Sequence, residues 1–150
     1  MRTDEIRLQC CGKDEEIIWA RKGSRELVAY RKNVVYIAPK GLVSDIRASK
    51  TAKLTQSDKL KKYFDVIERI ERGEGRAEGF VSERKTLDSG IEAICIESME
   101  GVRKWVDRKL LENFAYKRRY WFDDNGWYNG MVFIEEENEL KGIIMILNVK

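Results

Sequence analysis

Residues 16–38, EIIWARKGSRELVAYRKNVVYIA, decide the fold because short β-forming runs alternate there with turn residues. Runs rich in β-branched and aromatic side chains predict strands over Glu16–Arg21, Glu26–Arg31 and Val34–Ala38. Gly23-Ser24 supplies the turn between the first two of these strands. Turns this short join antiparallel neighbours, so the segment predicts a β-meander.

The two flanks of the meander have weaker patterns. Upstream, the alternation of Glu5–Cys10 predicts another strand, and downstream Pro39 ends the run of strands. Between Lys40 and Lys53 the pattern is weak, and it allows either a short turn of helix formed by Leu42, Val43 and Ile46 or a partly mobile basic connection.

A longer helix is predicted from Thr55 to Gly73. Thr55 with Asp58 forms a capping-box pattern at its start, and Gly73 is suited to the position after its end. Acidic and basic residues four positions apart predict that Arg69 pairs with Asp65. The apolar face consists of Leu60, Tyr63, Phe64, Val66, Ile67 and Ile70.

The following segment alternates again between strand and helix patterns. Short strands are predicted around Gly79–Ser82 and over Ile91–Ile96. Ser98 is then a suitable cap for a second helix with an i, i+4 apolar row. The row consists of Val102, Val106, Leu110 and Phe114, flanked by Trp105 and Leu111.

Two hairpins are predicted near the C-terminus. Asn125-Gly126 is a dipeptide that strongly favours a two-residue hairpin turn. Glu137–Glu139 separates a strand over Met131–Ile134 from one over Ile143–Leu147. Together the elements predict an α+β fold with residues 1–150 in a single domain. Its largely antiparallel sheet consists of the N-terminal β-meander and the C-terminal hairpins, with two main amphipathic helices packed on it.

The composition is that of a folded protein with a heavily charged surface. The chain has 150 residues, of which 43% are hydrophobic and 37% charged, and its net charge is only +3. These values exclude global disorder. No apolar run approaches the roughly 18 residues of a membrane-spanning helix, so a cytoplasmic protein with no membrane partner is expected. The glutamate- and lysine-rich, histidine-free composition is also a skew found in hyperthermophile proteins.

Catalytic and metal chemistry is restricted by the absence of histidine, which removes Ser-His-Asp and Cys-His systems and histidine-containing zinc sites. Cys10, Cys11 and Cys95 are too few for a four-cysteine zinc site and are expected to stay reduced. No cofactor is predicted, and a non-catalytic protein is favoured.

Clustered carboxylates leave one catalytic alternative, a metal-dependent nuclease. It would use Asp123-Asp124, or Glu135–Glu137 with Glu139 and Lys141. Such charges are also typical of solvated hairpin ends and edge strands, which is the favoured interpretation.

The stretch Tyr116–Phe122, YKRRYWF, contains only basic and aromatic residues. Residues 98–122 around it hold seven cations and three acids, so positive charge is concentrated there. Strand alternation predicts that Tyr120 and Phe122 face the core while Trp121 faces outward. Cations with exposed rings are the groups that contact phosphates and stack on bases.

We therefore expect a small protein that binds RNA or DNA without catalysing a reaction. In this hypothesis phosphates are contacted by Lys104, Arg108, Lys109, Lys117, Arg118 and Arg119, and bases stack on Tyr120, Trp121 and Trp127. The alternative is a protein-interaction or inhibitor module, such as an accessory protein of a virus or mobile element. It would use the same aromatic residues against a protein partner or a second copy of the chain, with the acidic C-terminal hairpin as a polyanion-like surface. Steep weakening by salt separates the two, because counterion release governs binding to nucleic acid.

Overall fold

The computed structural model describes residues 16–30, 33–39, 41–49 and 53–149. The strand predicted over Glu5–Cys10, and with it Cys10 and Cys11, lies outside the described residues. The strands are β1 Glu16–Lys22, β2 Arg25–Tyr30, β3 Val34–Ile37, β4 Lys53–Gln56, β5 Arg76–Thr86, β6 Glu92–Ser98, β7 Arg103–Asp107, β8 Arg119–Asp123, β9 Met131–Glu136 and β10 Glu139–Met145. The helices are α2 Leu42–Ser49, a 3₁₀ helix η1 Asp58–Leu60, α3 Lys62–Glu71 and α4 Arg108–Leu111.

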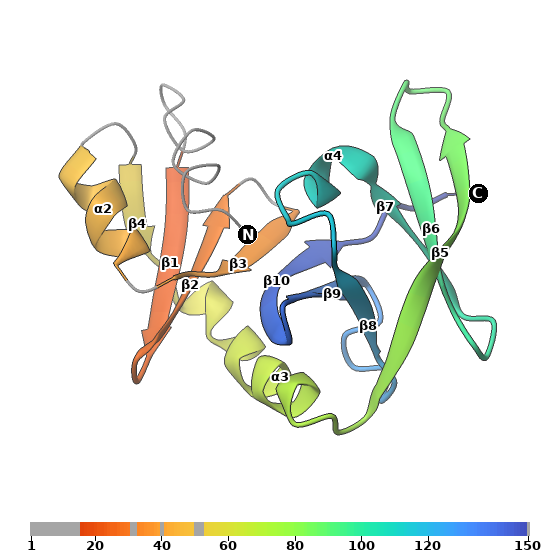
Figure 1. Ribbon diagram of the computed structural model, residues 1–150. Coiled ribbons are helices and arrows are strands. Elements are labelled where there is room, and N and C mark those ends of the chain that lie inside the picture. The colour runs from red at the N-terminus through yellow and green to blue at the C-terminus, as the bar shows by residue number, and fades with distance from the viewer. Residues whose placement is uncertain (1–15, 31–32, 40, 50–52, 150) are drawn as a thin grey trace.

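The structure is mixed and dominated by strands, of which ten in the described part form one sheet in the order β4-β1-β2-β3-β10-β9-β8-β5-β6-β7. Every described pair is antiparallel except β1 with β4, so the predicted largely antiparallel sheet is confirmed. β1, β2 and β3 form the predicted meander, and β3 pairs with β10 (Figure 1). A bridge between Trp105 and Leu147 ties β7 to the chain that follows β10, so strands β5 to β10 curve round on themselves.

Both faces of the sheet carry a core. The first core, on the face that α2 and α4 cover, consists of Ile17, Trp19, Val28, Val34, Tyr36, Leu42, Val43, Ile94, Ile96, Val106, Leu111, Phe114, Tyr120, Phe122, Val132, Ile134 and Ile144. The second core, under α3, consists of Ala20, Leu27, Ala29, Val35, Leu60, Tyr63, Phe64, Val66, Ile67, Ile70, Trp121, Phe133, Leu140 and Ile143. Central strands are therefore buried on both sides, which removes the simple alternation of buried and exposed residues.

α3 confirms the predicted apolar face and the predicted end at Gly73. Gly73 has a φ of 78°, and its N–H donates to the Ile70 carbonyl at 3.0 Å, as in a Schellman motif. The predicted ion pair of Arg69 with Asp65 is wrong. The Asp65 carboxylate lies 3.2 Å from Lys22, and Arg69 pairs instead with Asp123 of β8.

The predicted start of this helix at Thr55 is wrong. Thr55 belongs to β4, which pairs in parallel with β1. The cap is Ser57, whose side chain accepts a hydrogen bond from the Lys59 N–H at 3.3 Å at the start of η1. α3 itself begins only at Lys62. The short helix predicted around Leu42 is confirmed as α2.

The second predicted helix, from Ser98 to Phe114, is wrong. The chain turns at Gly101, which has a φ of 86°, and residues 103–107 pair with β6 as β7. Only Arg108–Leu111 is helical. Valine and tryptophan side chains favour strands, and pairing with β6 outweighs the helical spacing of the apolar row.

The C-terminal hairpins are confirmed, but their turns differ from the prediction. β9 pairs antiparallel with both β8 and β10. The tight turn is Glu137-Asn138, where both residues have positive φ values of 51° and 65°, as in a type I′ turn. Around Asn125-Gly126 the connection is instead the longer loop 124–130.

Candidate nucleic-acid interface

β8 carries the basic and aromatic stretch into the middle of the sheet. Tyr120 and Phe122 lie in the first core, as predicted. Trp121 lies on the opposite face, but it is only 7% exposed, so the predicted outward orientation is wrong. The guanidinium carbons of Arg76 and Arg119 lie 3.7 and 4.8 Å from its ring centroid and cover the ring. Neither Tyr120 nor Trp121 has a free face on which a base could stack.

Arg119 is held by carboxylates on the neighbouring strands. Its Nε and Nη2 donate to the two carboxylate oxygens of Glu78 at 2.8 and 2.9 Å, and its Nη1 lies 3.5 Å from Glu135. This hydrogen bonding raises the pKa of Arg119 and lowers the pKa of Glu78. A phosphate at this position would compete with a bidentate carboxylate.

Arg118 contacts the chain around it. Its Nε donates to the Tyr120 hydroxyl at 2.8 Å, and its Nη1 donates to the carbonyl oxygens of Leu111 and Ala115 at 2.9 and 3.4 Å. These carbonyls lie at the end of α4 and in the loop after it, where helix carbonyls lack partners within the helix. Arg118 therefore stabilises the exit of α4.

Arg108 and Lys104 are also committed to contacts within the fold. Arg108 forms ion pairs with Glu92 and, at 3.4 Å, with Glu112. Lys104 is 7% exposed, and its Nζ lies 4.7 Å from the Phe122 ring centroid. Burial lowers the pKa of Lys104, and the negative charge of Asp123 on β8 raises this pKa by a smaller amount. Lys104 is not positioned to contact a phosphate in solvent.

Lys109 and Lys117 are the two predicted phosphate-contacting residues that remain exposed without an ion pair in the described part of the chain. Tyr116, beside Lys117, is 94% exposed. Sequence reasoning missed Arg84 and Lys85, two exposed cations of β5 that likewise have no ion-pair partner among the described residues. Their adjacency within a polar strand was the only signal that pointed to them.

These exposed cations gather at one end of the sheet. Gly79 pairs with Tyr120, so the part of β5 beyond Gly79 runs past the start of β8. β5 and β7 both end at this end of the sheet, where β6 begins, because each of them is antiparallel to β6. α4 follows β7 directly (Figure 1). Lys117 lies two residues before β8.

Two open cavities lie at this end of the sheet. The first, about 370 Å³, is lined by Arg84, Lys85, Thr86, Glu92, Ala93, Ile94 and Arg108. The second, about 400 Å³, is lined by Lys117, Arg118, Arg119, Glu135, Glu137 and Asn138. Cations outnumber carboxylates in both linings.

Trp127 lies at the other end of β8, in loop 124–130, and is 83% exposed. β8 separates it from Lys117, so the structure does not combine the predicted rings and cations into one patch. The loop that carries Trp127 is nevertheless firmly held.

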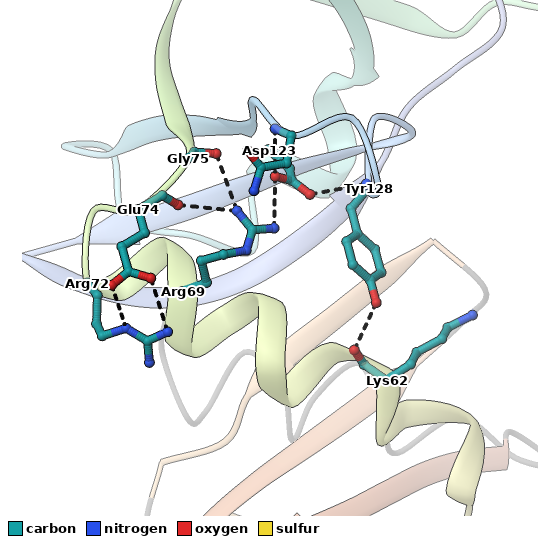
Figure 2. A network of polar contacts seen from close by, with 8 residues as sticks. Lys62, Arg69, Arg72, Glu74, Gly75, Asp123 and Tyr128 are labelled. Atoms are coloured by element: carbon teal, nitrogen blue, oxygen red, sulfur yellow. Dashed lines mark hydrogen bonds and ion pairs between the residues drawn. The ribbon is translucent and has the colours of Figure 1, made fainter.

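A buried carboxylate fixes this loop against α3 (Figure 2). The Asp123 side chain is 0% exposed, and its Oδ1 lies 2.8 Å from Nη2 of Arg69. The same carboxylate accepts hydrogen bonds from the N–H groups of Asn125 at 3.1 Å and Tyr128 at 3.2 Å. The Tyr128 hydroxyl donates to the Lys62 carbonyl at 3.0 Å.

Four carboxylates of the nuclease hypothesis, Asp123, Glu135, Glu136 and Glu139, contact other groups of the fold. Besides Asp123 and Glu135, Glu136 accepts a hydrogen bond from the Ala115 N–H at 2.8 Å. Lys141 donates to Glu139 at 2.8 Å and thereby lowers the pKa of Glu139. In the part of the chain that the structure describes, no group of three or more His, Cys, Asp or Glu side chains could hold a metal ion. Cys95 is a buried free thiol.

Comparisons with protein-family models, with curated proteins and with solved structures give no match. None of the described helices is both long and apolar enough to cross a membrane. A function is therefore inferred from the arrangement of the side chains alone.

Proposed function

We propose that the protein binds RNA or DNA, without catalysing a reaction, through a surface around α4. This α4 surface consists of Arg84, Lys85, Lys109, Tyr116 and Lys117. The proposal is supported by the gathering of four exposed cations, unpaired in the described part of the chain, at one end of the sheet. Cations that replace condensed counterions on a polyanion are the main source of affinity for nucleic acid.

Tyr116 supplies a stacking group within this surface. It is 94% exposed, in the segment that joins α4 to β8. Stacking of a base on an aromatic side chain stabilises a complex by about 1–3 kcal/mol. Tyr116 takes the role predicted for Tyr120 and Trp121, whose rings are buried.

Fluorescence anisotropy with labelled single- and double-stranded oligonucleotides, repeated over a salt series, tests the proposal. The double variant Lys109→Gln with Lys117→Gln is expected to weaken binding and to reduce the slope of log affinity against log salt by about 0.7–0.9 per lost contact. Tyr116→Ala is expected to lower single-strand affinity by about 1–3 kcal/mol with little change in that slope.

The matched control is Lys53→Gln with Lys59→Gln, which removes the same charge from exposed positions in β4 and η1, away from α4. Binding by the control variant should stay close to that of the wild type. Equal losses in both double variants would refute the α4 surface as the binding site. Absence of binding by the wild type at about 50 mM salt would refute nucleic-acid binding altogether.

Protein binding is a second candidate, favoured by Trp127. An 83% exposed tryptophan on a loop fixed by a buried carboxylate has the properties of an interface hot spot. Because Trp127 and the α4 surface lie at opposite ends of β8, Trp127→Ala is expected to leave oligonucleotide affinity unchanged. Loss of that affinity in Trp127→Ala would place the nucleic acid at the Trp127 end.

A further inference from the structure

The cavity of about 370 Å³ at the end of β5 is walled by three elements. Arg84 pairs with Ile94 and Thr86 with Glu92, so strand alternation places Arg84 and Thr86 on the same face of the β5–β6 ladder. Arg108 enters from the first turn of α4. Lys85 completes the lining from the neighbouring position on β5.

The charges in this cavity are unbalanced. Glu92 and Glu112 hold Arg108 in ion pairs, whereas no carboxylate in the described residues pairs with Arg84 or Lys85. Glu92 and Glu112 thus offset Arg108, and Arg84 and Lys85 are two cations of the lining without an ion-pair partner among the described residues. A phosphomonoester carries a charge of about −1.5 to −2 near pH 7, which matches these two cations.

An internal phosphodiester matches the cavity less well. It carries a single negative charge, and its strand has to enter and leave the site. A terminal phosphate needs an opening on one side only, and its extra charge strengthens each hydrogen bond from a guanidinium.

We propose that this cavity binds the terminal phosphomonoester of a nucleic-acid strand. Arg84 contacts the phosphate, the Thr86 hydroxyl donates a hydrogen bond, and Lys85 adds positive charge beside them. Arg108, which Glu92 and Glu112 hold in ion pairs, forms the wall of the cavity on the α4 side. The inference rests on the proposed function, since the nucleotides beyond the terminal one lie on the rest of the α4 surface.

The experiment compares one oligonucleotide sequence in three forms, with a 5′-phosphate, with a 3′-phosphate and with hydroxyl groups at both ends, at about 150 mM salt. Wild-type protein is expected to bind one phosphorylated form about tenfold more tightly than the hydroxyl form. Arg84→Gln is expected to reduce this ratio to about one, and Arg84→Lys to keep part of it. Lys117→Gln, which removes an equal charge outside the cavity, should weaken all three forms alike.

The outcomes separate the inference from the function on which it rests. Equal affinity of the wild type for the three forms overturns the terminal-phosphate site and leaves nucleic-acid binding standing. A preference that survives in Arg84→Gln also overturns the site. Competition by adenosine monophosphate as strong as that by the unlabelled phosphorylated strand would assign the cavity to a free nucleotide and overturn the strand-end proposal. Failure of all three forms to bind removes both.

Discussion

Replacing Asp123 by Asn removes one charge from the buried contact between α3 and loop 124–130. The Asp123 carboxylate lies 2.8 Å from Arg69, whose side chain is 20% exposed, and accepts hydrogen bonds from two N–H groups of the loop. In the Asp123→Asn variant, Arg69 keeps its positive charge and loses its carboxylate partner. An asparagine oxygen can still accept one of the loop hydrogen bonds, but its NH₂ group opposes the other donors.

The magnitude follows from what Arg69 retains. Breaking a buried ion pair by removing one partner destabilises a protein by about 3–5 kcal/mol. Arg69 also donates to the carbonyl oxygens of Glu74 at 3.2 Å and Gly75 at 3.4 Å, so its charge is not left without partners. We therefore expect the lower end of the range, about 3 kcal/mol, which corresponds to a fall in Tm of about 6–12 °C for a chain of this size.

Urea unfolding followed by circular dichroism measures this loss. Asp124→Asn is the matched control, because it makes the same chemical change at an exposed neighbour and should alter stability by less than about 0.5 kcal/mol. Amide hydrogen exchange at Asn125 and Tyr128 should accelerate in Asp123→Asn only, since their N–H groups donate to this carboxylate. Equal stabilities of the two variants would contradict the role assigned to Asp123.

Three further substitutions test the cores. Gly79→Ala places a Cβ 2.6 Å from Ile96 and should destabilise by about 1–3 kcal/mol, whereas Gly130→Ala, with nothing within 4 Å, should be close to neutral in the same urea assay. Phe114→Ala, which empties a 4% exposed site in the first core, should cost about 3–5 kcal/mol, and a loss under about 1 kcal/mol would show that the ring is not packed. Lys104→Met should be more stable than the wild type at pH 7, because burial disfavours the ammonium and lowers its pKa. This advantage should shrink as pH rises from the lowered pKa towards the ordinary value of 10.5, and a pH-independent difference would contradict it.

Local patterns predicted the elements whose pairing or packing agrees with local propensity. The meander over residues 16–38 was predictable because β-forming runs and the Gly23 turn coincide. The apolar face of α3 was predictable from helical spacing. From Ser98 to Phe114 the helical spacing led to the wrong prediction of one long helix, because an i, i+4 row of apolar residues also fits a strand followed by a short helix. Gly101 and Trp105 decide between the two only once β6 is available for pairing.

The candidate site was harder to predict, since its residues depend on which strands become central. Trp121 alternates outward in sequence, but β8 lies between β5 and β9 and is covered on that side by arginines and α3. Arg84 and Lys117 are 33 positions apart in sequence and reach one end of the sheet only through the antiparallel pairing of β5 with β8. Neither the burial of Trp121 nor the meeting of Arg84 and Lys117 at one end of the sheet can be recognised from any single segment of the sequence.

Pairing within the sheet also changes how many cations are available to a polyanion. The six cations predicted from the sequence would give a salt slope of about 4.2–5.4, at 0.7–0.9 per phosphate contact. In the structure Arg108 and Arg119 are paired with carboxylates, Arg118 binds carbonyl oxygens and Lys104 is buried. The four cations of the α4 surface, which have no ion-pair partner among the described residues, give a slope of only about 2.8–3.6. A measured slope above about 4 would therefore mean that the strand arginines exchange their carboxylates for phosphates on binding, and Glu78→Gln should then raise the affinity by releasing Arg119.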